Sequence, residues 1–266
     1  MLEKVVLIAL FIFGQTLSAA QIKGDKEGII ALGEEMTTLK YMLGVFGLIG
    51  TDVTYKAPKK RLKQEIKDYE EKLSLLEKEF ASNKEVLKKI KESSKAWLAV
   101  KSDLQEAFKQ QSSQKELESK AISIHSRIKS AINKLEEVKE LILKDTKLSN
   151  MKELNASIEI ATNISDINSH YIMSMWGLKD PTIKEHWDQA LSSYQKHLKI
   201  LENSKFAKDK DIAPLLKTVK KEYEFFKFVT LMSKDGKYTP ALIQEHSDRA
   251  REAALKMIEL ILVSKN

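Results

Sequence analysis

Apolar residues recur every three or four positions along almost the whole chain. Leu62, Ile66, Tyr69, Leu73 and Leu76 are separated by 4, 3, 4 and 3 residues, which places all five on one face of an α-helix. No stretch shows the sustained alternation of a half-buried strand. The pattern predicts an all-α fold with helices at residues 27–50, 59–80, 83–109, 115–144, 151–178, 181–204, 212–233 and 240–263.

The positions of proline, glycine and N-cap residues agree with these helices. The four prolines, at positions 58, 181, 214 and 240, lie near predicted helix starts, where a missing N–H is tolerated. Asp180 and Thr239 each precede a proline and are good N-cap residues. Gly44, Gly47 and Gly50 lack the strand and the Lys of a phosphate loop, so they predict close helix packing or a helix end. Short links between helices predict antiparallel neighbours in bundles.

Three segments of the first half recur in the second half in the same order. The pairs are 41–48 with 171–178, 62–76 with 187–201, and 90–97 with 219–226, at offsets of 130, 125 and 129 residues. The first pair reads YMLGVFGL and YIMSMWGL. Ordered matches of this kind predict a tandem repeat, with one antiparallel four-helix bundle at residues 21–148 and a second at residues 149–266.

The first 20 residues have the features of a secretory signal peptide. A short head with one Lys precedes the apolar segment 5–13, and Ser18, Ala19 and Ala20 supply the small residues of a cleavage site. The apolar segment is well below the about 20 residues needed to span a bilayer. We therefore expect residues 1–20 to be a signal peptide and the mature chain to be periplasmic, with an uncleaved anchor as the alternative.

Composition excludes several classes of function. The sequence has no Cys, which rules out disulfides, thiol chemistry and c-type haem attachment. The formal net charge is +7, from 45 Lys and Arg against 38 Asp and Glu, but the two signs alternate as on solvated helix faces. We expect no nucleic-acid partner, and only weak association with an anionic membrane surface or cell-wall polymer.

The ordered motifs resemble the periplasmic sensor domain shared by chemotaxis transducers of the PilJ type, from type IV pilus systems, and nitrate/nitrite sensor kinases of the NarX type. The resemblance rests on the first helix ending at 41–48, on aromatic residues in the next two helices, and on the segment 238–242, YTPAL. It implies two such domains, a helical bundle that senses a small ligand outside the membrane, and a homodimer formed through the first helix of a repeat.

Two departures limit what the resemblance implies. The family's membrane-spanning and signalling segments have no counterpart in residues 21–266, so we expect a signal to pass to a separate envelope protein. The nitrate sensors clamp their anion with Arg in the first helix, a task suited to its fixed charge and forked donors. Here residues 21–60 contain no Arg, and residues 153–178 contain neither Arg nor Lys. We therefore do not transfer nitrate binding to this chain.

The predicted helix 151–178 is polar for an inner helix. Its candidate ligand-binding residues are Asn163, Asp166, Asn168, His170, Tyr171 and Trp176. Because buried polar groups without partners cost free energy, these residues predict a ligand pocket or a dimer seam. The alternatives are that the polar residues face water and that the two aromatic residues belong to an ordinary core.

Histidine spacing gives no support for a metal site. His186 and His197 are 11 residues apart, which is about 16 Å along a helix, so they cannot bind one ion together. His170 could meet one of them only if the two helices aligned, and no Glu-x-x-His pair supports a ferritin-like metal enzyme. We expect solvated or core-edge histidines, no metal, no cofactor and no catalytic residue.

The sequence thus predicts an exported, non-enzymatic, sensor-like helical-bundle protein that binds an unknown small ligand or a partner protein in the periplasm. The alternative is a structural or interaction protein of the cell envelope that has kept the bundle and lost the ligand.

Overall fold

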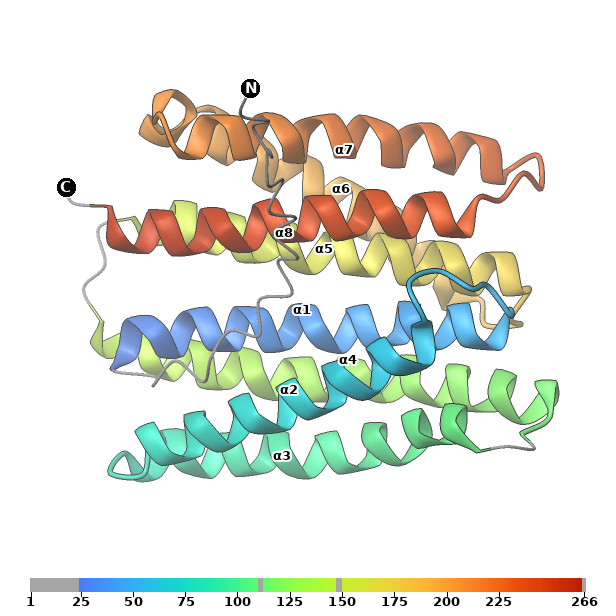
Figure 1. The fold of residues 1–266 in the computed structure, drawn as a ribbon. Coiled ribbons are helices and arrows are strands. Elements are labelled where there is room, and N and C mark those ends of the chain that lie inside the picture. Colours follow the sequence, from blue (N-terminus) through green and yellow to red (C-terminus); the bar gives the residue numbers. More distant parts are fainter. Residues whose placement is uncertain (1–23, 110–111, 147–149, 265–266) are drawn as a thin grey trace, which may run out of the picture.

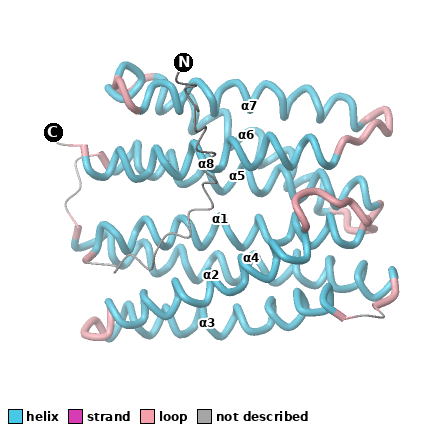
Figure 2. Tube along the Cα trace, viewed as in Figure 1, coloured by secondary structure: helices cyan, strands magenta, loops and turns pink. Residues whose placement is uncertain are grey.

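The computed structural model describes residues 24–109, 112–146 and 150–264. In these ranges the chain is all-helical, with eight α-helices and no strand, as the apolar spacing predicts. The helices are α1 Asp25–Gly50, α2 Pro58–Glu79, α3 Lys84–Leu104, α4 Gln114–Asp145, α5 Met151–Trp176, α6 Thr182–Glu202, α7 Ile212–Ser233 and α8 Pro240–Val263. They lie side by side along roughly one direction (Figure 1), and the links that the structure describes in full are short loops (Figure 2).

Most helix ends fall within two residues of the prediction, and the largest difference is at the end of α3. The predicted helix 83–109 stops at Leu104, and a 3-10 turn, η1 Gln105–Phe108, follows it. Such turns commonly tighten the last turn of an α-helix. A second one, η2 Lys205–Lys208, follows α6. The predicted signal peptide 1–20 lies outside the described residues, as does residue 148, the predicted end of the first repeat.

Helices α1 and α5 lie at the centre of the molecule. α1 packs against α2, α4 and α5, while α5 packs against α1, α6 and α8. The outer pairs are α3 with α4 and α7 with α8. The first helices of the two predicted repeats, which were expected to offer a seam to a second chain, therefore contact each other.

Glycine residues on α1 allow this close contact. A Cβ atom on Gly44 would lie 2.7 Å from Asn168 Nδ2, and one on Gly47 would lie 2.7 Å from Ile172 Cγ2. Both distances are shorter than a van der Waals contact, so a larger side chain at either position would force these α5 side chains, or the helices themselves, to shift. The prediction of close helix packing is confirmed at these two glycines.

Within the described ranges, no helix combines the length and the apolar character needed to cross a bilayer.

Replacing Gly44 by Val should lower the free energy of unfolding by about 2 kcal/mol, because the new side chain overpacks the contact between α1 and α5. Denaturant unfolding measures the change. The matched control is Ala99→Val on the exposed face of α3, where we expect less than about 1 kcal/mol from helix propensity alone. Equal effects of the two substitutions would contradict the tight contact at Gly44.

Candidate metal centre

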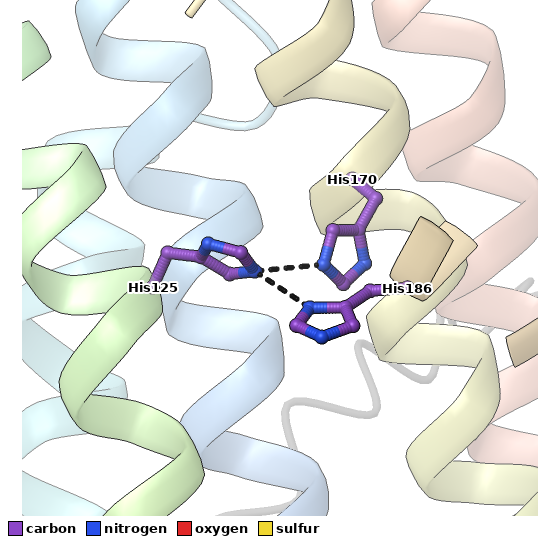
Figure 3. A group of neighbouring side chains, drawn as sticks. All are labelled: His125, His170 and His186. Atoms are coloured by element: carbon purple, nitrogen blue, oxygen red, sulfur yellow. Dashed lines mark hydrogen bonds between the residues drawn. The ribbon is translucent and has the colours of Figure 1, made fainter. Parts of the chain in front are cut away.

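Three histidines from three helices converge at one point. His125 lies on α4, His170 on α5 and His186 on α6, and their rings face one another (Figure 3). His125 Nε2 is 3.1 Å from His170 Nε2 and 3.2 Å from His186 Nδ1. These three nitrogen atoms all lie within 4.8 Å of one another. In the described part of the chain they form a group with the spacing of metal ligands.

The fold explains why these side chains meet. Gly177 ends α5 with a left-handed conformation, φ 76°, which is the usual way for a helix to end before the chain turns back. The turn that follows sets α6 against α5 and brings His186 beside His170, with ring centroids 5.6 Å apart. α4 reaches the same point because α1 packs against both α4 and α5.

The outer nitrogen of two rings is held by an oxygen acceptor. His125 Nδ1 is 2.9 Å from Asp180 Oδ2, and His170 Nδ1 is 2.7 Å from the backbone carbonyl oxygen of Asp166. Asp180 is itself fixed, because its Oδ1 accepts hydrogen bonds from the Thr182 backbone N–H at 2.9 Å and from the Thr182 hydroxyl at 2.7 Å. Metal-binding histidines commonly donate their second N–H to such an acceptor.

The protonation states follow from burial and from neighbouring charges. Burial lowers the pKa of His170 to about 4, and burial also lowers the pKa of His186. Burial alone would raise the pKa of Asp180, but hydrogen bonds from Thr182 and His125 outweigh it and lower that pKa. At neutral pH, His170 and His186 are therefore neutral and Asp180 is a carboxylate.

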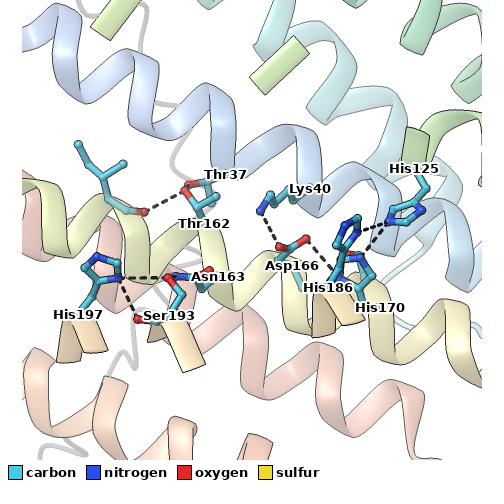
Figure 4. A network of polar contacts seen from close by, with 12 residues as sticks. Thr37, Lys40, His125, Thr162, Asn163, Asp166, His170, His186, Ser193 and His197 are labelled. Atoms are coloured by element: carbon cyan, nitrogen blue, oxygen red, sulfur yellow. Dashed lines mark hydrogen bonds and ion pairs between the residues drawn. The ribbon is translucent and has the colours of Figure 1, made fainter. Parts of the chain in front are cut away.

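Asp166 links the histidines to the centre of the fold. Burial would raise its pKa, but the charge and hydrogen bond of Lys40, together with the neighbouring His170 and His186, outweigh burial and lower this pKa. Lys40 Nζ, on α1, is 2.6 Å from Asp166 Oδ2, and Figure 4 shows Asp166 between Lys40 and His170. The ion pair therefore fixes the turn of α5 that carries His170.

The inner nitrogen atoms of His125 and His170 need a cation or a hydrogen-bond donor between them. A carboxylate and a carbonyl only accept hydrogen bonds, so His125 and His170 carry their hydrogen on Nδ1. In neutral rings the two Nε2 lone pairs then face each other across 3.1 Å. An extra proton on His125 Nε2 would make a good hydrogen bond to only one of its two neighbours. A metal ion would satisfy all three nitrogen atoms at once.

The donor set indicates the kind of ion. Three imidazoles suit Zn²⁺, Cu²⁺, Ni²⁺ or Fe²⁺, whereas Mg²⁺ and Ca²⁺ prefer oxygen ligands. Zinc–nitrogen bonds of about 2.0–2.1 Å in a tetrahedron place the nitrogen atoms about 3.3 Å apart. The separations of 3.1 and 3.2 Å are close to that value. The described donors therefore fit Zn²⁺.

Two of the six predicted site residues, Asp166 and His170, belong to this centre. The others hold α5 against its neighbours: Asn163 Nδ2 donates to Ser193 Oγ at 2.9 Å, and Asn168 Nδ2 donates to Gln244 Oε1 at 2.8 Å. The alternative that the polar residues of this helix face water is wrong for both, since Asn163 is 5% exposed and Asn168 0%.

The two predicted aromatic site residues also lie outside the centre. Tyr171 is fully buried, and its hydroxyl oxygen accepts a hydrogen bond from the Thr239 backbone N–H at 2.7 Å. Trp176 is half-buried over Gly50. The core alternative therefore describes Tyr171 best.

Sequence reasoning missed His125 and therefore missed the group. The prediction that His186 and His197 do not share an ion agrees with the fold, because His197 Nδ1 bonds to the Ser193 carbonyl oxygen of its own helix at 2.9 Å. His125 lies 45 residues before His170, on a helix of the other half, and no local spacing connects the two. The expectation of solvated or core-edge histidines is wrong for His170, which is 2% exposed.

Comparison with known proteins gives no further guide: no protein-family model, no curated protein and no solved structure matches the chain.

The metal-free protein should lose stability as the pH falls from about 6.5 towards 4. The pKa of His170 is lowered from 6.5 to about 4 on folding, so the unfolded chain takes up a proton first in this window. The loss should reach at most about 3 kcal/mol and should be fully recovered above pH 6.5.

Denaturant unfolding at several pH values checks this dependence. In His170→Gln the fall over the same window should be smaller, because Gln does not titrate. Asp166 and Asp180 have lowered pKa values, so their contributions are lost only at lower pH. Equal falls in the two proteins would contradict a buried neutral His170.

Proposed function

We propose that this protein binds one transition-metal ion, with zinc as the best fit, through His125, His170 and His186. The observation that carries the proposal is the convergence of three ring nitrogen atoms. The outer nitrogen atoms of His125 and His170 are bonded to Asp180 and to a backbone carbonyl, so in neutral rings the inner lone pairs are free to bind an ion. The ion would join α4 to the hairpin of α5 and α6. This proposal replaces our expectation of a protein without metal or cofactor.

We further propose that the fold is a tandem pair of four-helix bundles, α1 to α4 and α5 to α8. Equivalent helices have equivalent neighbours in the two halves. Equivalent aromatic pairs also support the repeat: Tyr69 packs on Trp97 with ring centroids 4.4 Å apart, and Tyr194 packs on Phe226 at 6.2 Å. The ligands of the proposed ion then come from both bundles.

A periplasmic, sensor-like role remains our proposal for the biological setting. It is supported by the signal-like residues 1–20 and by the resemblance to PilJ-type and NarX-type sensor domains. In this role the protein acts through a separate envelope protein, and the metal centre is where a chemical signal would act. The second candidate is a structural envelope protein in which the ion only holds the two halves together.

The first test is zinc binding measured by isothermal titration calorimetry. The purified full chain should bind one Zn²⁺, and His125→Ala or His186→Ala should weaken binding by at least about 100-fold, because each removes a ligand. Asp180→Asn should weaken it by about 10–100-fold through the orientation of His125. The control is His197→Ala, which lies on α6 outside the centre and should bind as the wild type does. Equal affinity in all four variants would refute the site.

The two biological candidates predict different responses in a thermal-shift screen of the zinc-loaded protein against small anions, organic acids and amino acids. A sensor should show a saturable rise in melting temperature with one ligand class, because binding to the native state stabilises it by mass action. A purely structural centre should show no rise beyond the one that zinc loading itself produces. No shift with any compound at millimolar concentration would remove the sensor proposal.

A further inference from the structure

The described chain offers three metal ligands at the centre and no fourth. Among the His, Asp and Glu side chains of the described ranges, His125, His170 and His186 form the one group of three or more whose donor atoms all lie within 4.8 Å of one another. The chain has no Cys to complete the set. Structural zinc sites usually hold four protein ligands, whereas three protein ligands leave a position for water or an external molecule.

The nearest carboxylates are engaged on the far side of the rings. Asp180 has one oxygen atom at 2.9 Å from His125 Nδ1 and the other bonded to Thr182. Asp166 pairs with Lys40 at 2.6 Å, and its other oxygen atom is 3.3 Å from His170 Nδ1. Asp180 therefore cannot bind the ion without releasing His125, and Asp166 cannot bind it without giving up its ion pair with Lys40.

The centre is least buried on the side of α6. His170 and His125 are buried, with 2% and 8% of their surface exposed, but His186 is only partly buried. The preceding residue on α6, Glu185, is exposed, and so is Lys129, which follows His125 by one helical turn on α4. A small molecule could therefore approach past the His186 ring.

The charge balance at this edge favours an anion. A divalent ion held by three neutral imidazoles keeps its full charge of about +2. The positive charge of Lys129 also acts at His186, against the negative charges of Asp166 and Glu185. With Lys40 and Asp180 included, three negative side chains stand against two positive ones and the ion, so the loaded centre has a net positive charge of about +1.

From this geometry we infer that the bound ion keeps one coordination position that the chain does not fill, and that a small anionic donor from solvent exchanges with water there. The inference rests on the proposed metal function. Exchange is a ligand substitution: one water molecule leaves, one anion binds, and no electron is transferred. The position lies at the His186 edge of the centre, where the ligands are least buried.

Cobalt(II) and azide test this inference on the full chain. Cobalt(II) binds to sites of three imidazoles and gives visible absorption bands that change with its coordination. We expect uptake of one cobalt ion and a saturable shift of the bands when azide is added. His197→Ala should behave in the same way, and excess zinc should abolish both signals by displacing the cobalt.

Two other outcomes would overturn the inference, and they are distinguishable. If one cobalt ion binds but its bands do not respond to azide, the chain fills every position; the inference then fails and the metal function stands. If the chain takes up neither cobalt nor zinc, the proposed function fails and the inference fails with it.

Discussion

The contact between α1 and α5 is the constraint on which the rest of the structure depends. α1 also packs against α4, and α5 also packs against α6, so this contact decides whether His125 can reach the other two histidines. Its closeness comes from Gly44 and Gly47, where a Cβ atom would already be too near α5. The Lys40–Asp166 ion pair of 2.6 Å crosses the same contact one helical turn from His170.

Hydrogen bonds to neighbouring helices account for the buried asparagines of α5, but they do not account for the histidines. Asn163 and Asn168 each donate a hydrogen bond to an acceptor on a neighbouring helix, which offsets part of the hydrogen bonding to water that is lost on burial. The His125–His170 contact is different, because two acceptors face each other when both rings are neutral. Stabilising such an arrangement requires a cation between the rings, either a proton or a metal ion, and only a metal ion also serves His186.

The sequence predicts the helices well because they are long and strongly periodic. The stripe from Leu62 to Leu76 is regular enough to fix the type and the approximate bounds of α2, and prolines and capping residues locate most helix starts. The candidate site was predictable only in part. Asp166 and His170 stood out as polar residues on an inner helix, but the role of His125 depends on how two halves of the chain pack. That packing is set by contacts between residues more than 100 positions apart, such as Lys40 and Asp166. Local sequence spacing does not predict such contacts.

The central claim is that three imidazoles bind one metal ion between the two halves. Zinc K-edge X-ray absorption of the protein loaded with one equivalent of zinc tests it most directly. The account predicts a first shell of nitrogen and oxygen atoms at about 2.0–2.1 Å, with outer-shell scattering that fits three imidazole rings. A first shell of oxygen atoms alone, without imidazole scattering, would show that zinc binds at surface carboxylates and would contradict the account.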